Sequence, residues 1–339
     1  MMPTMARRLS VPLWALALAG PLALSACGKD STTIIPSGPT SPLTIVCPAA
    51  QSAVSIRSQP ATVTWTAPIA TGGTAPVSTT CTPASGSAFG IGSTIVGCMA
   101  AGSSANQAAS CTFTVTVTRP PQVSVTRFMA FGDSITWGTA APVAGYLPYK
   151  DPPPSYAYPS QLLGLLGARY LDQSLTVANE GWPGESINTG LGRLPDAITY
   201  NAPEVLLLLD GANDLLGNPS SATTQYIAAK LRDMIRAAKA RSPTITVLLA
   251  TFPPQWHGTT PYDRGAGADY VPELNQLIAS VATSEGATLV DLYTPLSANI
   301  KQYIGADGLH PTEAGFTLMA QTFSAAIQQK FEVKTGAGS

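Results

Sequence analysis

Two short segments far apart in the chain carry the residue types of an acyl-transfer site. The first, Gly132-Asp133-Ser134, follows an apolar run that is typical of a buried strand. The second, Asp307-Gly308-Leu309-His310, places a carboxylate three residues before an imidazole. A serine hydroxyl is a weak nucleophile until a neighbouring base accepts its proton, and a histidine oriented by a carboxylate can be that base. The only other histidine is His257, which leaves a serine hydrolase little choice of base.

The elements that must position these residues begin near residue 125, where apolar runs alternate with helical stripes. Five runs are predicted to be strands: Arg127–Phe131, Leu175–Ala178, Val205–Leu209, Ile245–Ala250 and Thr288–Asp291. Their near-continuous apolar character is typical of a parallel sheet covered by helices on both faces. We therefore predict a three-layer α/β/α domain with a five-stranded parallel sheet, whose sites lie at the carboxyl ends of the strands.

Polar segments from four parts of the chain are expected to meet at that edge of the sheet. Ser134 follows the first strand, Gly184 lies in the segment after the second, and Asn213 lies in the segment after the third. Asp307 and His310 occupy the loop before the last helix. The convergence of four distant segments predicts one site more strongly than any single motif does.

The order and spacing of these segments resemble the GDSL or SGNH hydrolases over residues 126–331. The resemblance implies a flavodoxin-like α/β/α fold and a serine esterase or lipase. In such an enzyme Ser134 is the nucleophile, and His310, oriented by Asp307, is the general base and then the general acid. The Gly-x-Ser-x-Gly motif of the nucleophile-elbow hydrolases does not occur in the sequence.

The same resemblance implies an oxyanion hole with three donors. These are the backbone N–H groups of Ser134 and Gly184 and the side-chain amide of Asn213. Gly181 competes with Gly184 for the second role, and the Glu-Ser pair after Gly184 favours Gly184. Asp133 is expected to shape the turn rather than to react.

Residues 1–26 have the layout of a secretory signal peptide. Arg7 and Arg8 precede an uncharged apolar stretch that is short for a membrane span. The stretch ends in Leu24-Ser25-Ala26-Cys27, which resembles a bacterial lipoprotein box and implies that Cys27 is lipidated. Gly28, rather than an aspartate, then favours the outer membrane or cell surface. The alternative is an ordinary signal peptide that leaves Cys27 an unpaired thiol.

The remaining composition indicates how the exported chain is divided. After residue 26 there are 16 basic and 19 acidic residues with no basic stripe, so nucleic acid is not an expected partner. Residues 27–42 are rich in Ser, Thr, Pro and Gly and are predicted to be a flexible stalk. Residues 119–125 are predicted to be a Pro-rich linker, and residues 332–339 a disordered tail.

Residues 43–118 differ from the rest of the chain, since Arg57 is their only charged residue. Period-2 alternation in runs such as Thr112–Val117 predicts short antiparallel strands in a small β-sandwich. The segments Ile45-Val46-Cys47-Pro48 and Ser110-Cys111-Thr112-Phe113 resemble a hyalin-repeat (HYR) module, which implies an immunoglobulin-like fold.

Four cysteines in this module allow three disulfide connectivities. We favour Cys81–Cys98, across adjacent strands, and Cys47–Cys111, which joins the first strand to the last. The cysteine spacing does not fit zinc, and the module offers calcium no carboxylate. The module is therefore expected to be a spacer, with adhesion to a surface ligand as the alternative.

Together these features predict an exported, lipid-anchored serine esterase that needs no metal or cofactor. Short acyl groups, such as acetyl esters on carbohydrate, are the favoured substrates. A long-chain lipase or lysophospholipase is the enzymatic alternative, and a non-enzymatic surface adhesion protein is the other. A proline- and tyrosine-rich run, residues 142–159, follows the nucleophile and is a candidate for substrate contact.

Overall fold

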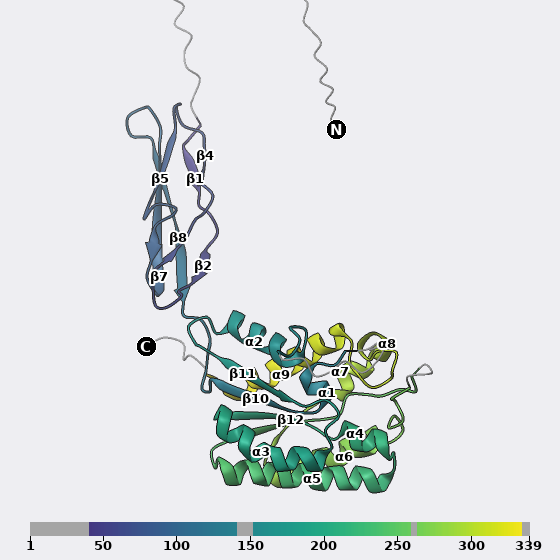
Figure 1. Ribbon diagram of the computed structural model, residues 1–339. Helices are drawn as coiled ribbons and strands as arrows, with labels where there is room; N and C mark the ends of the chain where they lie inside the picture. Colours follow the sequence, from purple (N-terminus) through teal and green to yellow (C-terminus); the bar gives the residue numbers. More distant parts are fainter. Residues whose placement is uncertain (1–40, 141–151, 259–262, 334–339) are drawn as a thin grey trace, which may run out of the picture.

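The computed structural model describes residues 41–140, 152–258 and 263–333, which form two domains (Figure 1). A narrow β-domain leads through a short linker into a larger α/β domain. The predictions for Cys27, for the stalk before residue 41 and for the tail after residue 333 fall outside the described residues.

The larger domain is built on five parallel strands in the order β11-β10-β12-β13-β14, which confirms the predicted sheet. These strands are β10 Arg127–Gly132, β11 Thr176–Gly181, β12 Val205–Leu209, β13 Thr246–Ala250 and β14 Thr288–Val290. β10 and β12 are buried over nearly all of their length, as continuous apolar runs require. The chain passes from β10 outward to β11 and then back to β12, so the direction of winding reverses between β10 and β12. Ligand sites form at such a reversal.

Helices cover both faces of this sheet (Figure 1). One face carries α2 Tyr158–Arg169 and α9 Glu313–Phe331, and the other carries α3 Ile187–Asn201, α5 Ser221–Arg241 and α6 Val271–Glu285. The short helices are α1 Ser134–Trp137, α4 Ala212–Gly217, α7 Tyr293–Ser297 and α8 Ile300–Tyr303. The apolar stripes of α5 and α9 are fully buried against the sheet, for example Leu231 and Phe323. None of the described helices is both long and apolar enough to span a membrane.

The β-domain is a strand-rich sandwich around one small apolar core. Its strands are β1 Thr44–Val46, β2 Gln51–Val54, β3 Ala61–Thr62, β4 Ile69–Thr71, β5 Ser78–Thr82, β6 Ala88–Phe89, β7 Gly92–Ala101 and β8 Ala108–Thr118. They form a sheet of order β2-β8-β7-β5 and two strand pairs, β1-β4 and β3-β6. The expected antiparallel pairing holds except that β2 runs parallel to β8. Because five strands separate these two in sequence, no hairpin fixes their relative direction.

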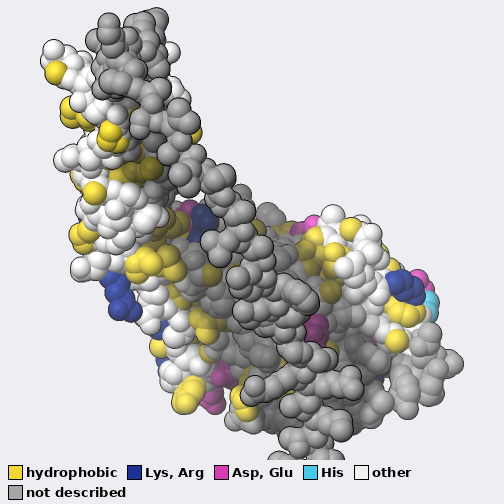
Figure 2. Space-filling view, turned by 90° about the horizontal axis from the view of Figure 1, so that it is seen from above, with side chains coloured by type: hydrophobic (Ala, Val, Ile, Leu, Met, Phe, Trp, Pro, Cys, Tyr) yellow, Lys and Arg dark blue, Asp and Glu magenta, His cyan; other side chains and the backbone are white. Residues whose placement is uncertain are grey.

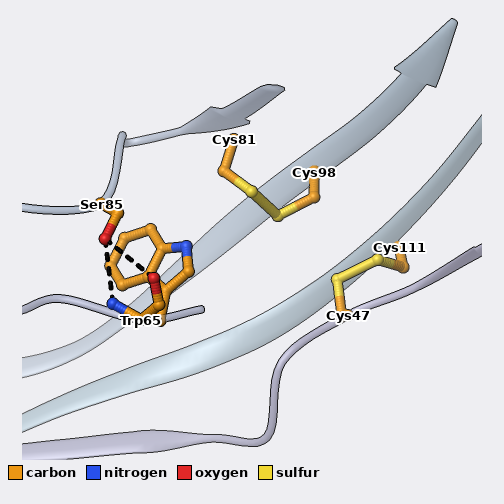
Figure 3. Close-up of a disulfide and its surroundings, with 6 residues drawn as sticks. All are labelled: Cys47, Trp65, Cys81, Ser85, Cys98 and Cys111. Carbon is orange, nitrogen blue, oxygen red and sulfur yellow. Dashed lines mark hydrogen bonds between the residues drawn. A yellow bond between two sulfur atoms is a disulfide. The ribbon is translucent and has the colours of Figure 1, made fainter. Parts of the chain in front are cut away.

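Two disulfides brace this core, and they are the pairs favoured above (Figure 3). Cys81 and Cys98 lie directly opposite each other on β5 and β7, and Cys47 joins the end of β1 to Cys111 on β8. Trp65 packs edge-on against Phe113, with ring centroids 5.0 Å apart. The visible surface of the module is mostly uncharged, as Figure 2 shows. Disulfides therefore supplement a core that is small for its length.

The linker is docked on the α/β domain. Strand β9, Gln122–Val123, pairs antiparallel with β15, Glu332–Val333. The Gln173 side chain accepts from the Val123 amide at 2.7 Å and donates to its carbonyl at 2.8 Å. The prediction of a disordered tail from residue 332 is therefore wrong for Glu332 and Val333. Glu332 is ordered because Arg169 binds it through two hydrogen bonds, of 2.7 and 2.8 Å.

Candidate active site

Ser134, His310 and Asp307 form one continuous chain of hydrogen bonds. The Ser134 Oγ lies 3.0 Å from the His310 Nε2, and the His310 Nδ1 lies 2.6 Å from the Asp307 Oδ2. All three residues are buried, so the relay is shielded from bulk water. This geometry allows His310 to accept the serine proton while Asp307 stabilises the resulting imidazolium.

Asp307 is held by the turn that also carries the histidine. Its Oδ1 accepts hydrogen bonds from the Leu309 and His310 amides at 3.1 and 3.0 Å, which leaves Oδ2 for the imidazole. Burial raises the pKa of the Asp307 carboxyl, but its bonds and charge interaction with His310 and the two amides outweigh this and keep the pKa below its usual range. Gly308 has a φ of +78°, and a Cβ there would lie 1.8 Å from the Trp256 carbonyl oxygen. Only glycine fits this turn.

Ser134 opens helix α1, and Asp133 caps that helix. The Asp133 Oδ1 accepts the Ile135 amide at 3.0 Å, and its Oδ2 accepts the Ala212 amide at 2.9 Å. Asp133 thereby ties the nucleophile loop to the loop that precedes α4. Burial raises the pKa of Asp133 to about 6, although both amides act in the opposite direction.

The structure separates the two glycines that compete for the oxyanion hole. Gly181 is the last residue of β11, its amide donates to the Asn179 Oδ1 at 2.9 Å, and a Cβ there would lie 2.0 Å from the Trp137 amide nitrogen. Gly184 is exposed in the following loop with a φ of +81°. Its amide makes no hydrogen bond within the described parts of the chain. The geometry therefore favours Gly184 over Gly181.

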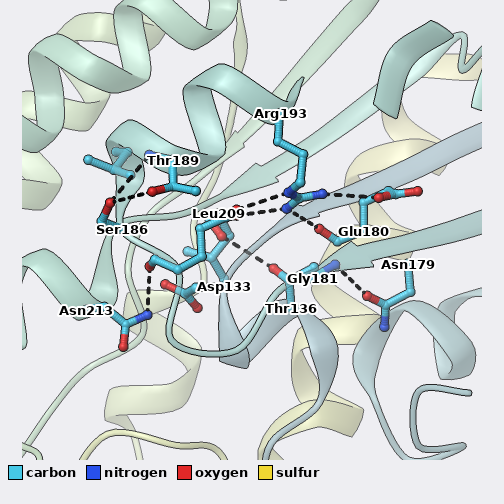
Figure 4. A network of polar contacts seen from close by, with 12 residues as sticks. Asp133, Thr136, Asn179, Glu180, Gly181, Ser186, Thr189, Arg193, Leu209 and Asn213 are labelled. Carbon is cyan, nitrogen blue, oxygen red and sulfur yellow. Dashed lines mark hydrogen bonds and ion pairs between the residues drawn. The ribbon is translucent and has the colours of Figure 1, made fainter. Parts of the chain in front are cut away.

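Asn213 lies beside Gly184 with its amide already oriented. The Asn213 Nδ2 donates to the Glu185 carbonyl at 2.9 Å, which leaves its second N–H for an oxyanion (Figure 4). The residue lies in α4, directly after the loop that follows β12. Preorganised donors of this kind are worth roughly 3–4 kcal/mol each to a tetrahedral oxyanion.

An arginine that the sequence analysis missed clamps the Gly184 loop. Arg193 of α3 binds both carboxylate oxygens of Glu185, at 2.8 and 3.0 Å, and the Glu180 carboxylate at 3.1 Å (Figure 4). Its guanidinium also stacks over the Phe131 ring, 4.1 Å from the centroid. The sequence pointed to Glu185 only through the Glu-Ser pair after Gly184. No periodic pattern relates residue 185 to residue 193, so the contact between them could not be predicted.

Other candidates from the sequence are placed away from the chemistry. His257 is a surface residue with a 65% exposed side chain. Tyr158 is buried and stacks on Phe323, and Tyr156 stacks on Phe316, so these two tyrosines of the aromatic run belong to the packing against α9. Tyr146 and Tyr149 lie outside the described residues. No group of three or more metal-ligating side chains occurs among residues 41–140, 152–258 and 263–333.

A cleft of about 640 Å³ lies beside the candidate oxyanion donors. Its lining includes Gly184, Ser186, Asn213, Asp214, Asn218 and Tyr226. A second cleft, of about 430 Å³, is lined by Trp182 and Arg193 among others. The two clefts share Gly184 and Ser186 in their linings.

Comparisons with known proteins agree with this geometry. Residues 130–318, more than half of the chain, match the model of the GDSL-like lipase/acylhydrolase family, and residues 39–117 match the HYR domain. The chain is 25% identical over 154 residues to the esterase TesA of Pseudomonas aeruginosa, covering 45% of this chain and 70% of that protein. It is 24% identical over 186 residues to an arylesterase of Vibrio mimicus, covering 55% and 80%.

A solved structure is also among the proteins that the chain matches. The lipase/acylhydrolase from Enterococcus faecalis superposes with a TM-score of 0.49 at 24% identity, covering 62% of this chain and all of that one. Ser134, Asp307 and His310 all lie within the matched residues 130–318. The chain therefore belongs to the GDSL-like lipase/acylhydrolase family, whose members hydrolyse carboxylic esters, and it carries an HYR domain in front of the hydrolase domain.

Proposed function

We propose that this protein hydrolyses carboxylic esters through an acyl-enzyme on Ser134. The observation that carries the proposal is the buried relay from Ser134 through His310 to Asp307. The Ser134 Oγ attacks the ester carbonyl while its proton passes to the His310 Nε2. The protonated His310 then donates that proton to the departing alcohol, and water completes the cycle by the reverse transfer.

Three donors are proposed to hold the oxyanion of each tetrahedral intermediate. They are the amides of Ser134 and Gly184 and the free N–H of the Asn213 side chain. Support comes from the oriented Asn213 amide and from the exposed, unbonded Gly184 amide. The Arg193 clamp keeps Gly184 in place at no cost of reorganisation during the reaction.

The direct test is hydrolysis of p-nitrophenyl acetate by Ser134→Ala. We expect a fall in kcat of at least about 10⁴-fold, because the nucleophile and the base act as one unit. Ser280→Ala, which removes the same hydroxyl from an exposed position on α6, is the matched control and should retain full activity. Equal hydrolysis by Ser134→Ala and wild type would contradict the proposed nucleophile, and rates no faster than the uncatalysed reaction in both would favour an adhesion protein.

For the substrate, we propose short acyl groups on a polar alcohol such as a carbohydrate. None of the described residues that line the larger cleft is Leu, Ile, Val, Met or Phe, so the cleft offers an alkyl chain no large aliphatic side chain to pack against. Tyr226 is 40% exposed and offers an aromatic face, and the Asn218 amide lies close by as a polar partner. Sugars have apolar C–H faces and hydroxyl groups that suit such a surface.

Two measurements test this preference. A p-nitrophenyl ester series should give its highest kcat/KM for the shortest acyl groups, and a maximum at eight carbons or more would support a long-chain lipase. Tyr226→Ala should raise KM for an acetylated oligosaccharide and leave p-nitrophenyl acetate hydrolysis unchanged. Tyr200→Ala, at a position 88% exposed on α3, is the matched control. An equal loss on both substrates would contradict a sugar subsite.

We further propose export and lipid anchoring through Cys27, at the outer membrane or cell surface. The support is the basic, apolar and Leu-Ser-Ala-Cys sequence of residues 1–27 and the disulfides of the β-domain, which persist in oxidising compartments. Metabolic labelling with an alkynyl fatty acid should tag the wild type and not Cys27→Ser. Labelling of both proteins would argue against this anchor.

A further inference from the structure

Asp210 is a fully buried acid that the proposed reaction does not use. It follows β12 directly and precedes Asn213 by three residues. Neither of its carboxylate oxygens has a hydrogen-bond partner of good geometry in the described parts of the chain, and the Gly211 amide offsets its burial only in part. An ionised carboxylate without partners is strongly disfavoured in a protein interior, and such a group takes up a proton instead.

The groups that face Asp210 are themselves acidic. Asp133 faces it from the end of β10, Glu185 from the loop before α3, and Asp214 from α4. Arg193 binds Glu185 and Glu180, and no ion pair to Asp210 forms within the described residues. Each neighbour therefore adds to the cost of a negative charge on Asp210.

The local packing is shaped around this carboxyl group. Gly190 of α3 faces it, and a Cβ at that position would lie 2.3 Å from the Asp210 Oδ2 and 3.1 Å from the Glu185 Oε1. The absence of a side chain at Gly190 thus lets both carboxyl groups lie against the same turn of the helix. Two carboxyl groups held this close avoid repulsion when one of them keeps its proton.

We propose that Asp210 is a positioning residue, held as a neutral carboxylic acid beneath the oxyanion hole, whose deprotonation at alkaline pH slows hydrolysis. The proposal rests on the proposed esterase function. When Asp210 is neutral, no negative charge at this position repels the oxyanion that develops on the substrate. When hydroxide removes the proton, the new carboxylate lies among Asp133, Glu185 and Asp214 and opposes charge on the substrate oxygen.

The direction of the pKa agrees with this geometry. Burial first, and then the charges of Asp133, Glu185 and Asp214, raise the pKa of Asp210 well above its ordinary value. Between that ordinary value and the raised one, the folded protein holds a proton that the unfolded chain has lost. The free energy of unfolding must therefore fall as the pH rises through this window.

Asp210→Asn tests the proposal, because asparagine has the shape of the protonated acid and cannot ionise. Wild-type kcat/KM on p-nitrophenyl acetate should decline by up to about tenfold per pH unit above the point of proton loss, and the variant should lack this decline. Asp233→Asn removes an exposed carboxylate from α5 and should follow the wild type. Parallel alkaline declines in all three proteins would overturn the proposal.

Two measurements separate its failure from failure of the esterase function. Infrared spectra at neutral pH should show the C=O stretch of a protonated carboxylic acid in the wild type and in Asp233→Asn, but not in Asp210→Asn. The unfolding free energy should fall with rising pH more steeply in the wild type than in Asp210→Asn. If Asp210→Asn keeps both the infrared band and the wild-type pH dependence of unfolding, Asp210 is ionised in the wild type, whether or not the protein is an esterase.

Discussion

At the residue scale, the site depends on the hydrogen bonds that orient each candidate catalytic side chain. Among the residues that the structure describes, the His310 ring hydrogen-bonds Ser134 and Asp307, and the carboxylate fixes its tautomer. Asp307 keeps its negative charge because its pKa lies below the usual range, despite burial. The nucleophile thus has a base that is both oriented and electrostatically supported.

Asp307→Asn should therefore lower kcat by about 10⁴-fold, because an amide in this position favours the wrong imidazole tautomer. Ester hydrolysis at neutral pH measures the loss. Asp269→Asn, an exposed change of the same kind, should be without effect. A decrease of less than about tenfold would show that the carboxylate is dispensable.

The same residue predicts how stability responds to acid. Because the pKa of Asp307 is lower in the folded protein than in the unfolded chain, its charge stabilises the fold above the unfolded pKa. That contribution is lost as the pH falls through the folded pKa. The difference in unfolding free energy between wild type and Asp307→Asn should thus be largest near neutral pH and shrink below about pH 4. A difference that grows on acidification would contradict this sign.

At the element scale, the α3 helix and the β11–α3 loop act as a unit. The Arg193 guanidinium forms ion pairs with Glu180, near the end of β11, and with Glu185, beside Gly184. The Glu185 side chain is only 2% exposed, so its charge depends on this partner. The position of the Gly184 amide is therefore set by the ion pair of the next residue, Glu185, with Arg193, which lies eight residues further along the chain.

Arg193→Met should destabilise the hydrolase domain by about 3–5 kcal/mol, because it leaves Glu185 buried and unpaired. Chemical unfolding measures the loss, and kcat/KM should fall with it as the Gly184 loop loosens. The double variant with Glu185→Gln should recover most of the stability. Arg241→Met, which removes an exposed hydrogen bond to Thr199, should cost less than about 1 kcal/mol. Equal costs at both arginines would rule out the clamp.

At the scale of the whole molecule, the HYR domain and the candidate active site lie at opposite edges of the hydrolase sheet (Figure 1). The module enters through β9 at the start of β10, whereas Ser134 follows the end of β10. The β9–β15 pair and Gln173 hold the linker on the hydrolase domain. This arrangement points the reactive edge away from the module.

The two domains have separate cores, so their stabilities should separate too. Loop-closure entropy predicts a loss of about 4 kcal/mol on replacing Cys47 and Cys111 by serine, and about 3 kcal/mol for Cys81 and Cys98, since the first disulfide closes the longer loop. In thermal unfolding of the full chain, the module should melt at a lower temperature in both variants than in the wild type, and at the lowest temperature in the variant that lacks Cys47 and Cys111. Ester hydrolysis should be unchanged, and loss of activity on module unfolding would indicate coupling between the domains.

Much of the fold and of the site follows from sequence patterns that are local. Burial on both faces requires continuous apolar strands, and this made β10, β12 and β13 predictable to within a residue. The three-residue spacing of Asp307 and His310 is closed by a single turn, so their pairing was also predictable. Ser134 could be assigned because the chain has only two histidines that could be its base, and one of them, His310, has a carboxylate three residues before it.

Only the tertiary structure shows that the Gly181 amide is taken up by the Asn179 side chain, whereas the Gly184 amide has no partner in the described parts of the chain, which favours Gly184. It also placed Arg193 on Glu185 and left the Asp210 carboxyl group without a hydrogen-bond partner of good geometry among the described residues, features that no sequence period encodes. The physical reason is the reversal of winding at β10, which brings loops from distant parts of the chain to one edge. The sequence by itself determined the reacting residues and their strands, and the packing of those loops determined which groups orient them and which acid is buried below.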